Sequence, residues 1–298
     1  MAPKVRTVAQ ELARLAERSH GVVTRAELLA AGVTAEQIKH RVRTGGLIPE
    51  FRGVYRVGHR APSVEARYLA AVRACGRGGV LSGRAAAYLR GLIRGSPPMP
   101  EVTAPTQRRV PGVRTIRTRG GSIQATTWRG IPVTTVPRTL VDLAAVLDVE
   151  DLARACHEAG VRYRTTPADV DAVLALRPRV AGAGKLRRIL HGDVRVTLSV
   201  LEKRFLQVLA TVGLPLPETN RPAGGRRVDC RWPEEQLTVE LDSYRFHHSR
   251  HSWELDRRRE REARARGDEF RRYTYGDVFE EPGLMLAELQ GLLRGVPS

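Results

Sequence analysis

Two helix-start signals stand ten residues apart near the beginning of the chain. Residues 24–27 (Thr-Arg-Ala-Glu) and 34–37 (Thr-Ala-Glu-Gln) both have the form of a capping box, in which two side chains satisfy backbone amides in the first turn of a helix. Gly32 lies between them as a turn residue, and residues 47–51 and 54–57 then alternate like the strands of a hairpin. With an amphipathic helix before them, this order predicts a winged helix-turn-helix.

The third predicted helix has two different sides. Ile38 and Val42 are four residues apart and predict a core face, whereas polar residues recur at helical spacing on the opposite side. Arg and Gln side chains hydrogen-bond base edges and phosphates, so this polar side suits the major groove of duplex DNA. The candidate DNA-binding residues in this region are Gln37, His40, Arg41, Arg43, Thr44 and Arg52. An ordinary solvated helix face is the competing interpretation.

The net charge of +18 favours a polyanionic partner such as nucleic acid. Residues 1–60 hold 11 Lys and Arg against 5 Asp and Glu, residues 61–196 hold 22 against 10, and residues 197–298 hold 17 against 17. The positive excess therefore belongs to the first two thirds of the chain. Because nearly all of it is Arg, GC-rich coding is an alternative origin.

Neither a membrane segment nor a disulfide framework is predicted. No apolar run approaches the roughly 20 residues of a membrane-spanning helix, and the first residues lack the apolar segment of a signal peptide. We therefore expect a soluble cytoplasmic protein without a membrane partner. Cys75, Cys156 and Cys230 lie far apart and form no CxxC pair, so they predict buried, reduced thiols rather than disulfides or a zinc site.

At about 150 residues per domain, a chain of 298 residues should hold two or three domains. We expect an α/β (α+β) multidomain protein with the winged helix over residues 1–60, a mixed α/β connector over 61–196 and a third domain over 197–298. The connector shows no Gly-rich phosphate loop, metal-ligand spacing or nucleophile elbow. Its predicted helices are 63–75, 82–91, 138–147, 149–160, 167–176 and 184–191, with strands near 101–104, 113–118 and 131–136.

The third domain contains two predicted strands around a four-residue loop. If the loop closes symmetrically, Trp232 pairs with Leu237 and Asp229 lies opposite Glu240. Side chains alternate between the two faces of a strand. One face is then apolar and suits a core, while the other presents Asp229, Glu240 and Asp242.

Carboxylates at opposed strand positions repel each other, because their Cβ atoms are about 4.5–5.5 Å apart. Three arrangements offset the repulsion: one carboxyl keeps its proton, a nearby Arg such as Arg231 neutralises the group, or a divalent metal binds the oxygens. Mg²⁺ or Mn²⁺ held by Asp229, Glu240 and Asp242 would activate water and stabilise a phosphodiester transition state. A solvent-facing acidic hairpin is the alternative.

Three further residues have both a functional and a structural interpretation. His247 follows the second strand and suits proton transfer or the positioning of a water. Glu202 lies three residues after Ser199, which is the spacing of a capping box, whereas a role as a site carboxylate requires its helix to pack beside the hairpin. Arg258 lies in a predicted helix of paired Glu and Arg residues and could face a substrate phosphate.

The first two thirds of the chain resemble a known family. Residues 53–56 (Gly-Val-Tyr-Arg), 81–87 (Leu-Ser-Gly-Arg-Ala-Ala-Ala) and 135–144 (Thr-Val-Pro-Arg-Thr-Leu-Val-Asp-Leu-Ala) are similar to the AbiEi-type antitoxins of type IV toxin–antitoxin systems. The resemblance implies an N-terminal winged helix, a DNA-binding repressor and a cognate toxin as partner.

The last hundred residues resemble a domain family related to the very short patch repair endonuclease, within the restriction-endonuclease-like PD-(D/E)XK superfamily of α/β/α folds. The motifs that carry this resemblance are residues 201–205, 228–229, 239–242, 246–247, 256–259 and 272–274. It implies that Asp229 and Glu240 are metal ligands, that Asp242 occupies the position of the superfamily's lysine, and that His247 matches a repair-enzyme histidine. Asp242 cannot supply a lysine's charge, and Asp268 stands where an aromatic residue is usual.

Two functions follow from these patterns. The first is a protein that binds double-stranded DNA through its winged helix and cleaves phosphodiester bonds with Mg²⁺ or Mn²⁺ in its third domain. The candidate catalytic residues for it are Asp229, Glu240, Asp242, His247 and Glu202, with Arg258 as a phosphate contact. The alternative is a non-enzymatic transcriptional repressor or antitoxin, in which the carboxylate hairpin is a fold element or partner surface.

Overall fold

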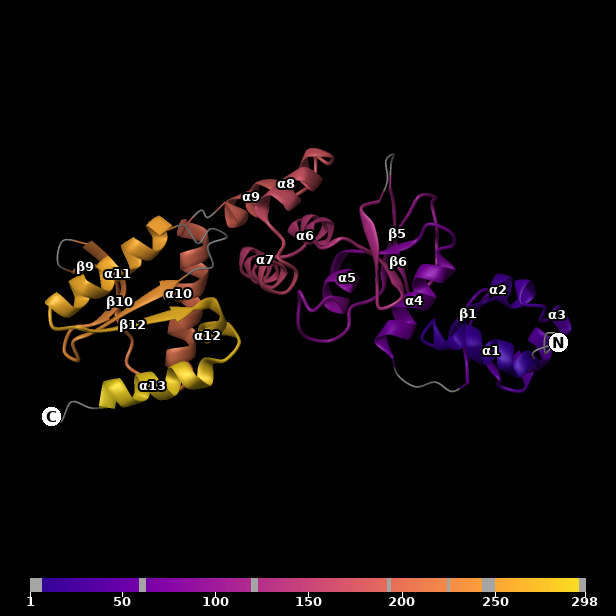
Figure 1. The fold of residues 1–298 in the computed structure, drawn as a ribbon, viewed down its shortest axis with the longest axis horizontal. Coiled ribbons are helices and arrows are strands. Elements are labelled where there is room, and N and C mark those ends of the chain that lie inside the picture. The colour runs from indigo at the N-terminus through magenta and orange to yellow at the C-terminus, as the bar shows by residue number, and fades with distance from the viewer. Residues whose placement is uncertain are drawn as a thin grey trace. The chain divides into compact units, whose positions relative to one another are not determined.

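The structure is a computed structural model that describes residues 7–58, 63–118, 123–191, 194–223, 226–242 and 250–294. The side chains within these ranges are described except at residues 9, 194–200, 226–227, 242, 250–257 and 294. The chain divides into two compact units: a first unit of residues 1–147 with 154–183, and a second unit of residues 148–153 with 184–298. Both units combine helices with sheets (Figure 1), which confirms the expected multidomain α/β class. The finer division at residues 60 and 196 stays a prediction.

The first unit begins with a winged helix-turn-helix. Its elements are α1 (Val8–Glu17), β1 (Val22–Thr24), α2 (Arg25–Ala30), α3 (Ala35–Arg43), β2 (Leu47–Phe51) and β3 (Val54–Val57). Both predicted capping boxes are present: Thr24 caps α2 together with Glu27, and Thr34 caps α3 together with Gln37. The predicted hairpin is confirmed as the antiparallel pair β2 and β3, and β1, which was not predicted, pairs with β3.

The three-stranded sheet, in the order β1-β3-β2, is covered on both faces. Val22 and Val23 are consecutive strand residues and point to opposite sides. Val23 packs in the core of the three helices, where Ile38 is buried and Val42 is partly buried as predicted. Val22 packs instead with residues of α4 (Val64–Ala74). The winged helix thus shares a hydrophobic core with the helix that follows it.

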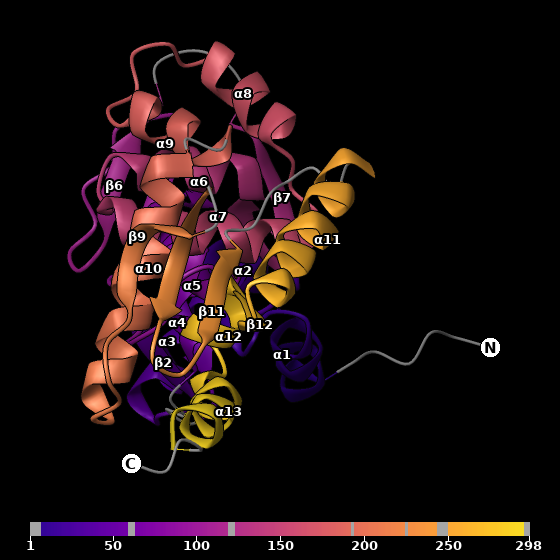
Figure 2. The ribbon, with the colours of Figure 1, turned by 90° about the vertical axis from the view of Figure 1, so that its left-hand side faces the viewer.

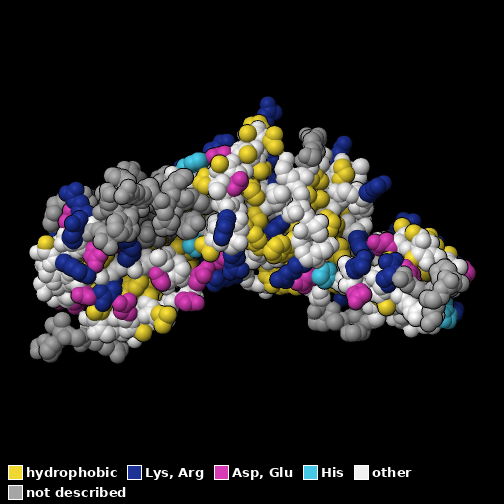
Figure 3. All heavy atoms as spheres, in the orientation of Figure 1, with side chains coloured by type: hydrophobic (Ala, Val, Ile, Leu, Met, Phe, Trp, Pro, Cys, Tyr) yellow, Lys and Arg dark blue, Asp and Glu magenta, His cyan; other side chains and the backbone are white. Residues whose placement is uncertain are grey.

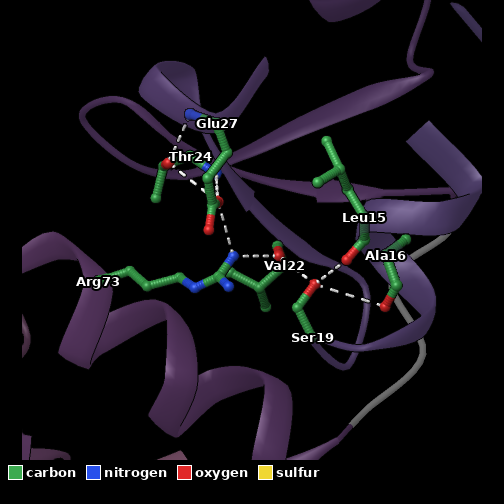
Figure 4. Close-up of polar contacts among 7 residues, drawn as sticks. All are labelled: Leu15, Ala16, Ser19, Val22, Thr24, Glu27 and Arg73. Atoms are coloured by element: carbon green, nitrogen blue, oxygen red, sulfur yellow. Dashed lines mark hydrogen bonds and ion pairs between the residues drawn. The ribbon is translucent and has the colours of Figure 1, made fainter. Parts of the chain in front are cut away.

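Arg73 ties α4 to the start of α2 (Figure 4). Its Nη1 donates a hydrogen bond of 3.0 Å to the Glu27 carboxylate and another to the backbone carbonyl oxygen of Val22. Glu27 also accepts from the backbone amide of Thr24 at 2.8 Å, which completes the capping box. The Ser19 hydroxyl lies 2.6 Å from the same Val22 oxygen. One carboxylate therefore both starts α2 and receives the cation of α4.

The rest of the first unit surrounds a five-stranded mixed sheet in the order β6-β5-β4-β8-β7. Its strands are β4 (Val80–Leu81), β5 (Glu101–Ala104), β6 (Arg114–Arg117), β7 (Ala125–Trp128) and β8 (Ile131–Thr134). The helices in this part of the chain are α5 (Gly83–Leu89), α6 (Val136–Ala144), α7 (Val149–Tyr163) and α8 (Pro167–Ala175). The three predicted strands are confirmed as β5, β6 and β8, whereas β4 and β7 were not predicted.

The second unit contains a four-stranded sheet in the order β12-β11-β10-β9. Its strands are β9 (Glu218–Ala223), β10 (Arg226–Trp232), β11 (Leu237–Asp242) and β12 (Glu269–Thr274). Its helices are α9 (Ala183–Leu190), α10 (Val194–Thr211), α11 (Arg250–Ala265), α12 (Tyr275–Phe279) and α13 (Pro282–Arg294). The strands β9 to β11 pair antiparallel, and α11 leads to β12, which is parallel to β11.

The sheet of the second unit has an apolar face and a polar face, as the alternation of β10 and β11 predicted. Cys230, Trp232 and Leu237 on the apolar face pack with residues of α10, α12 and α13. The helix α11 lies on the other side of the strands from α13 (Figure 1), and Figure 2 shows α10 and α11 flanking the sheet. The carboxylates of the hairpin therefore lie on the side that α11 covers.

One predicted helix start is wrong. The helix α10 begins at Val194, so Ser199 lies inside it rather than at its end. A capping box acts only at the first turn, where backbone amides lack partners within the helix. Glu202 therefore does not complete a cap with Ser199.

The three cysteines are free and buried, as expected. Burial raises the pKa of the Cys156 thiol to about 12, which keeps it protonated at neutral pH. Of the helices in the described part of the chain, none has both the length and the apolar character of a membrane span.

Candidate nucleic-acid interface and carboxylate cluster

A groove of about 650 Å³ lies between α3 and the β2–β3 hairpin. The helix contributes residues at positions i, i+3, i+4, i+7 and i+8, starting from Ala35, so one side of α3 forms a wall of this groove. Four cationic side chains line it: Arg25, Lys39, Arg43 and Arg52. Its apolar lining includes Ile38, Val42, Phe51 and Tyr55. The groove therefore combines an apolar lining with four cations and one acid, Glu50.

The hairpin turn is fixed to the start of α2 at one end of the groove. The backbone amide of Arg25 donates a hydrogen bond of 2.8 Å to the carbonyl oxygen of Gly53. Gly53 has a φ of +74°, in the left-handed region that favours glycine. This turn therefore brings the segments that carry Arg25 and Arg52 together.

Neighbouring acids neutralise only part of the positive charge of the groove. Lys39 pairs with Glu36 at 2.9 Å on the exposed surface, and Glu50 pairs with Arg56 at 3.2 Å. Among the residues whose side chains the structure describes, Arg25 and Arg52 form no ion pair. Exposed ion pairs contribute about 0–1 kcal/mol, so the pair of Lys39 does not prevent it from binding a phosphate.

The predicted polar stripe of α3 (Gln37, His40, Arg41 and Thr44) lies outside the lining of the groove. Gln37, His40 and Thr44 are exposed and Arg41 is half-buried. The Gln37 side-chain oxygen accepts a backbone amide in the cap of α3, which leaves its NH₂ group for other partners. The Thr44 hydroxyl donates to the His40 carbonyl oxygen at 3.0 Å. The stripe is therefore a second exposed surface on the same helix.

The structure brings Arg43 and Arg52 together at the groove, whereas Gln37, His40, Arg41 and Thr44 do not line it, although His40 Nδ1 lies 3.2 Å from Nη2 of Arg43. Arg25 and Lys39 also line the groove but were missed from the sequence. The signal for Lys39 was available, because it lies four residues from Arg43 and therefore on the same side of the helix. Arg25 gave no such signal, since only the folded hairpin brings it to the groove.

The carboxylate hairpin of the second unit has the predicted register. Trp232 pairs with Leu237, and the same ladder continues to Cys230 and Val239. At its end, Oδ2 of Asp229 accepts a hydrogen bond of 2.9 Å from the backbone amide of Leu241. The Asp229 side chain thus bridges the two strands.

Glu240 is buried beside a cation from α11. It is 5% exposed, and Arg259 donates to its Oε2 at 2.7 Å. Arg272 is its neighbour on β12. Burial, and then the charge of Asp229, raises the pKa of Glu240 to about 7 against the opposing effect of the two arginines. Arg259 and Arg272 therefore offset the repulsion between the carboxylates.

Arg231, the example given for a neutralising arginine, pairs with Asp268 instead, and Arg259 takes that role at Glu240. Nε and Nη2 of Arg231 donate to Asp268 at 2.9 and 2.8 Å, and the Thr238 hydroxyl donates to the same carboxylate at 2.7 Å. Burial alone would raise the pKa of Asp268, but these hydrogen bonds lower it. Asp268, which stands where the endonuclease resemblance implies an aromatic residue, is thus the buried partner of Arg231.

Glu202 on α10 belongs to the same carboxylate cluster. Burial raises the pKa of Glu202, the charge of Asp229 raises it further, and a hydrogen bond from Thr219 opposes the shift. The charge of Asp229 therefore acts on both Glu202 and Glu240, which the sequence placed on two other elements. We call these three residues the carboxylate cluster.

The remaining predicted residues do not join this cluster within the described side chains. Asp242 ends β11, but its side chain is not among those described, and His247 lies outside the described residues. Arg258 pairs with Glu262 at 2.9 Å along α11.

The described side chains do not by themselves fit a bound divalent metal. Among them, no three His, Cys, Asp or Glu residues are grouped as ligands. Glu240 is already paired with Arg259, and one oxygen of Asp229 holds a backbone amide. The predicted ligand set also includes Asp242, so Mg²⁺ or Mn²⁺ binding stays a prediction.

The N-terminal segment of the chain is similar to a known family. Residues 10–58 match the family described as "Transcriptional regulator, AbiEi antitoxin". The match extends from α1 to the end of the hairpin and so includes every residue of the groove. It confirms the expected AbiEi resemblance for this segment, whereas the resemblance of the last hundred residues to a repair endonuclease stays a prediction.

The chain is also similar to two uncharacterized proteins of Mycobacterium tuberculosis, from strains CDC 1551 / Oshkosh and H37Rv. Each is 26% identical over 276 residues, which cover 86% of this chain and 96% of the relative. The similarity therefore extends over both units.

Glu240 should make the stability of the second unit depend on pH. Between the ordinary glutamate pKa of 4.5 and about 7, the folded protein keeps a proton on Glu240 that the unfolded chain releases. The free energy of unfolding should therefore fall as pH rises through this range. Relative to Glu240→Gln, we expect wild type to lose about 2–3 kcal/mol. Urea unfolding, read by amide exchange in β10 and β11, measures this difference.

Glu234→Gln, at an exposed position in the turn of the same hairpin, removes the same charge and is the matched control. It should reproduce the pH profile of wild type. Parallel profiles for wild type and Glu240→Gln between pH 4.5 and 7 would show that Glu240 is not held protonated.

Proposed function

We propose that this protein is a transcription regulator that binds duplex DNA through α3 and the β2–β3 hairpin. The groove with four cationic side chains, inside the segment that matches a regulator family, carries this proposal. A helix-turn-helix places its second helix in the major groove of DNA. With α3 in that position, the phosphate strand at the border of the major groove lies between α3 and the hairpin. Its charge then meets Arg25, Lys39, Arg43 and Arg52.

The two exposed sides of α3 suit two different tasks. The groove presents cations to phosphates, which position a protein on DNA without reading its sequence. Gln37 and Arg41, on the other side, have the side-chain types that hydrogen-bond adenine and guanine edges. We assign the phosphate contacts to the groove and the base contacts to this second side.

The family description also supports a partner. Because the matched family is described as an antitoxin, we infer that a cognate toxin binds this protein and that the regulated promoter is its own. Expression of the neighbouring gene with and without this chain tests that inference.

Substitutions on the two sides of α3 should have different effects on DNA binding. Arg41→Ala should reduce the preference for the chain's own promoter over a shuffled duplex by about 1–3 kcal/mol. The double substitution Arg43→Ala with Arg52→Ala should weaken binding to both duplexes equally. It should also reduce the magnitude of the slope of log K against log salt concentration by about 2. Fluorescence anisotropy over a salt series measures both quantities.

Arg188→Ala, at an exposed position on α9, is the matched control and should bind like wild type. The proposal fails if wild type binds the promoter and the shuffled duplex equally, or if the two sets of substitutions act alike.

Metal-dependent cleavage of DNA is a second candidate function. The charge of Asp229 acts on both Glu202 and Glu240, and this proximity of carboxylates favours it, because carboxylates are the ligands that Mg²⁺ and Mn²⁺ take in phosphodiesterases. A metal at Glu240 would have to compete with Arg259 for that carboxylate. A cleaving form therefore requires Arg259 to leave Glu240.

This second candidate predicts nicking of supercoiled plasmid in Mn²⁺ or Mg²⁺. Arg259→Gln should nick at lower metal concentration than wild type, since it no longer competes for Glu240. Glu202→Gln should lose the activity, whereas Glu234→Gln should keep it. If neither wild type nor Arg259→Gln nicks plasmid with either metal, the cleavage candidate is refuted and the regulator proposal is unaffected.

A further inference from the structure

A second basic surface lies on β6, the edge strand of the five-stranded sheet of the first unit. Residues 102–141 contain seven Arg and neither Asp nor Glu. In the structure this stretch includes β6, which is the end strand of its sheet among the described residues and pairs with β5. The Arg108 side chain lies against Gly76, so the loop of residues 76–79 is next to the segment that leads to β6. The strand and these two segments form what we call the β6 basic edge: Arg77, Arg108, Arg109, Arg114 and Arg117.

The arginines of the β6 basic edge are exposed and mostly uncompensated. All five are exposed to solvent. Arg114 pairs with the buried Glu101 at 3.4 Å. Among the described side chains, the other four form no ion pair. The surface therefore has a clear excess of positive charge, in contrast to the second unit, where Figure 3 shows Lys and Arg interspersed with Asp and Glu.

The backbone that carries these cations is held in place by hydrogen bonds. The Thr115 hydroxyl donates to the carbonyl oxygen of Arg108 at 2.7 Å, which folds the preceding loop onto β6. The backbone amide of Arg114 donates to the carbonyl oxygen of Pro100 at 2.8 Å, and the backbone amide of Thr118 donates to the carbonyl oxygen of Ala104 at 3.1 Å. A fixed backbone lowers the entropy lost on binding.

The chemistry of this surface favours phosphates over a protein partner. Protein interfaces depend on buried aromatic and apolar side chains, and residues 105–118 contain no aromatic residue. The same lack argues against single strands, whose bases stack on aromatic rings. Arg matches the paired oxygens of a phosphate. A duplex backbone is therefore the partner that fits.

We propose that the β6 basic edge binds the phosphate backbone of the duplex that the α3 groove binds. This inference rests on the proposed function, because both surfaces belong to the first compact unit and would act on one DNA molecule. Its role is to add affinity without adding sequence preference. The extended contact lengthens the stretch of DNA that one copy of the protein covers.

The double substitution Arg109→Ala with Arg117→Ala tests this proposal in the full-length protein. Each lost phosphate contact should lower the slope of log K against log salt by about 0.9. From 50 to 200 mM salt, wild type should then lose about 12-fold more affinity than the double variant. The loss should be equal on promoter and shuffled duplexes. Arg109→Lys with Arg117→Lys should restore most of the slope, because both charges remain.

Arg179→Ala with Arg188→Ala removes the same charge from exposed positions elsewhere and is the matched control. It should keep the wild-type slope. The proposal is overturned if the Arg109 and Arg117 double variant keeps the wild-type slope, or if the control loses as much. A double variant that self-associates but binds DNA as wild type would show that the charges only protect a strand edge. Failure of wild type to bind any duplex would instead refute the proposed function.

Discussion

The contact of Arg73 with Glu27 and Val22 determines how the helix-turn-helix is attached to the rest of the first unit. Glu27 caps α2, and Val22 lies on β1, so a single guanidinium on α4 holds both elements. Hydrogen bonds to charged groups contribute about 1.5–3 kcal/mol each when they are well formed. The shared apolar core around Val22 and Val54 adds to this attachment. The groove and the β6 basic edge are consequently parts of one compact unit.

The buried acidic residues of the second unit are likewise paired with arginines. Two carboxylates are buried there, and each receives an arginine that is distant in sequence. Glu240 is paired with Arg259 across 19 positions, and Asp268 with Arg231 across 37. A buried charge without a partner would cost several kcal/mol. These pairs therefore account for Glu240 and Asp268 in structural terms, and a metal at Glu240 would have to displace an existing cation.

Local signals predicted the first unit well. The capping boxes at Thr24 and Thr34 and the hairpin turn at Gly53 depend only on neighbouring residues, and each forms where expected. The core positions Ile38 and Val42 follow from helical spacing alone. The very short strands β1 and β4 were missed, because two or three residues give no measurable alternation.

Long-range contacts were much less predictable. The register of the carboxylate hairpin was predictable from its symmetric loop, but the partners of Glu240 and Arg231 depend on how α11 and β12 pack against it. The start of α10 was misplaced because Ser199 and Glu202 imitate a cap inside a longer helix. Arg25 reaches the groove only through the fold of the hairpin. In each case the decisive neighbour is distant in sequence.

The most direct measurement of the central claim is amide hydrogen exchange of the full-length protein with and without its promoter duplex. We expect exchange to slow in α3, in the β2–β3 hairpin and along β6, with no change in β10 and β11. Protection confined to β10, β11 and α11, with α3 and the hairpin unchanged, would contradict the claim that the first unit binds the DNA.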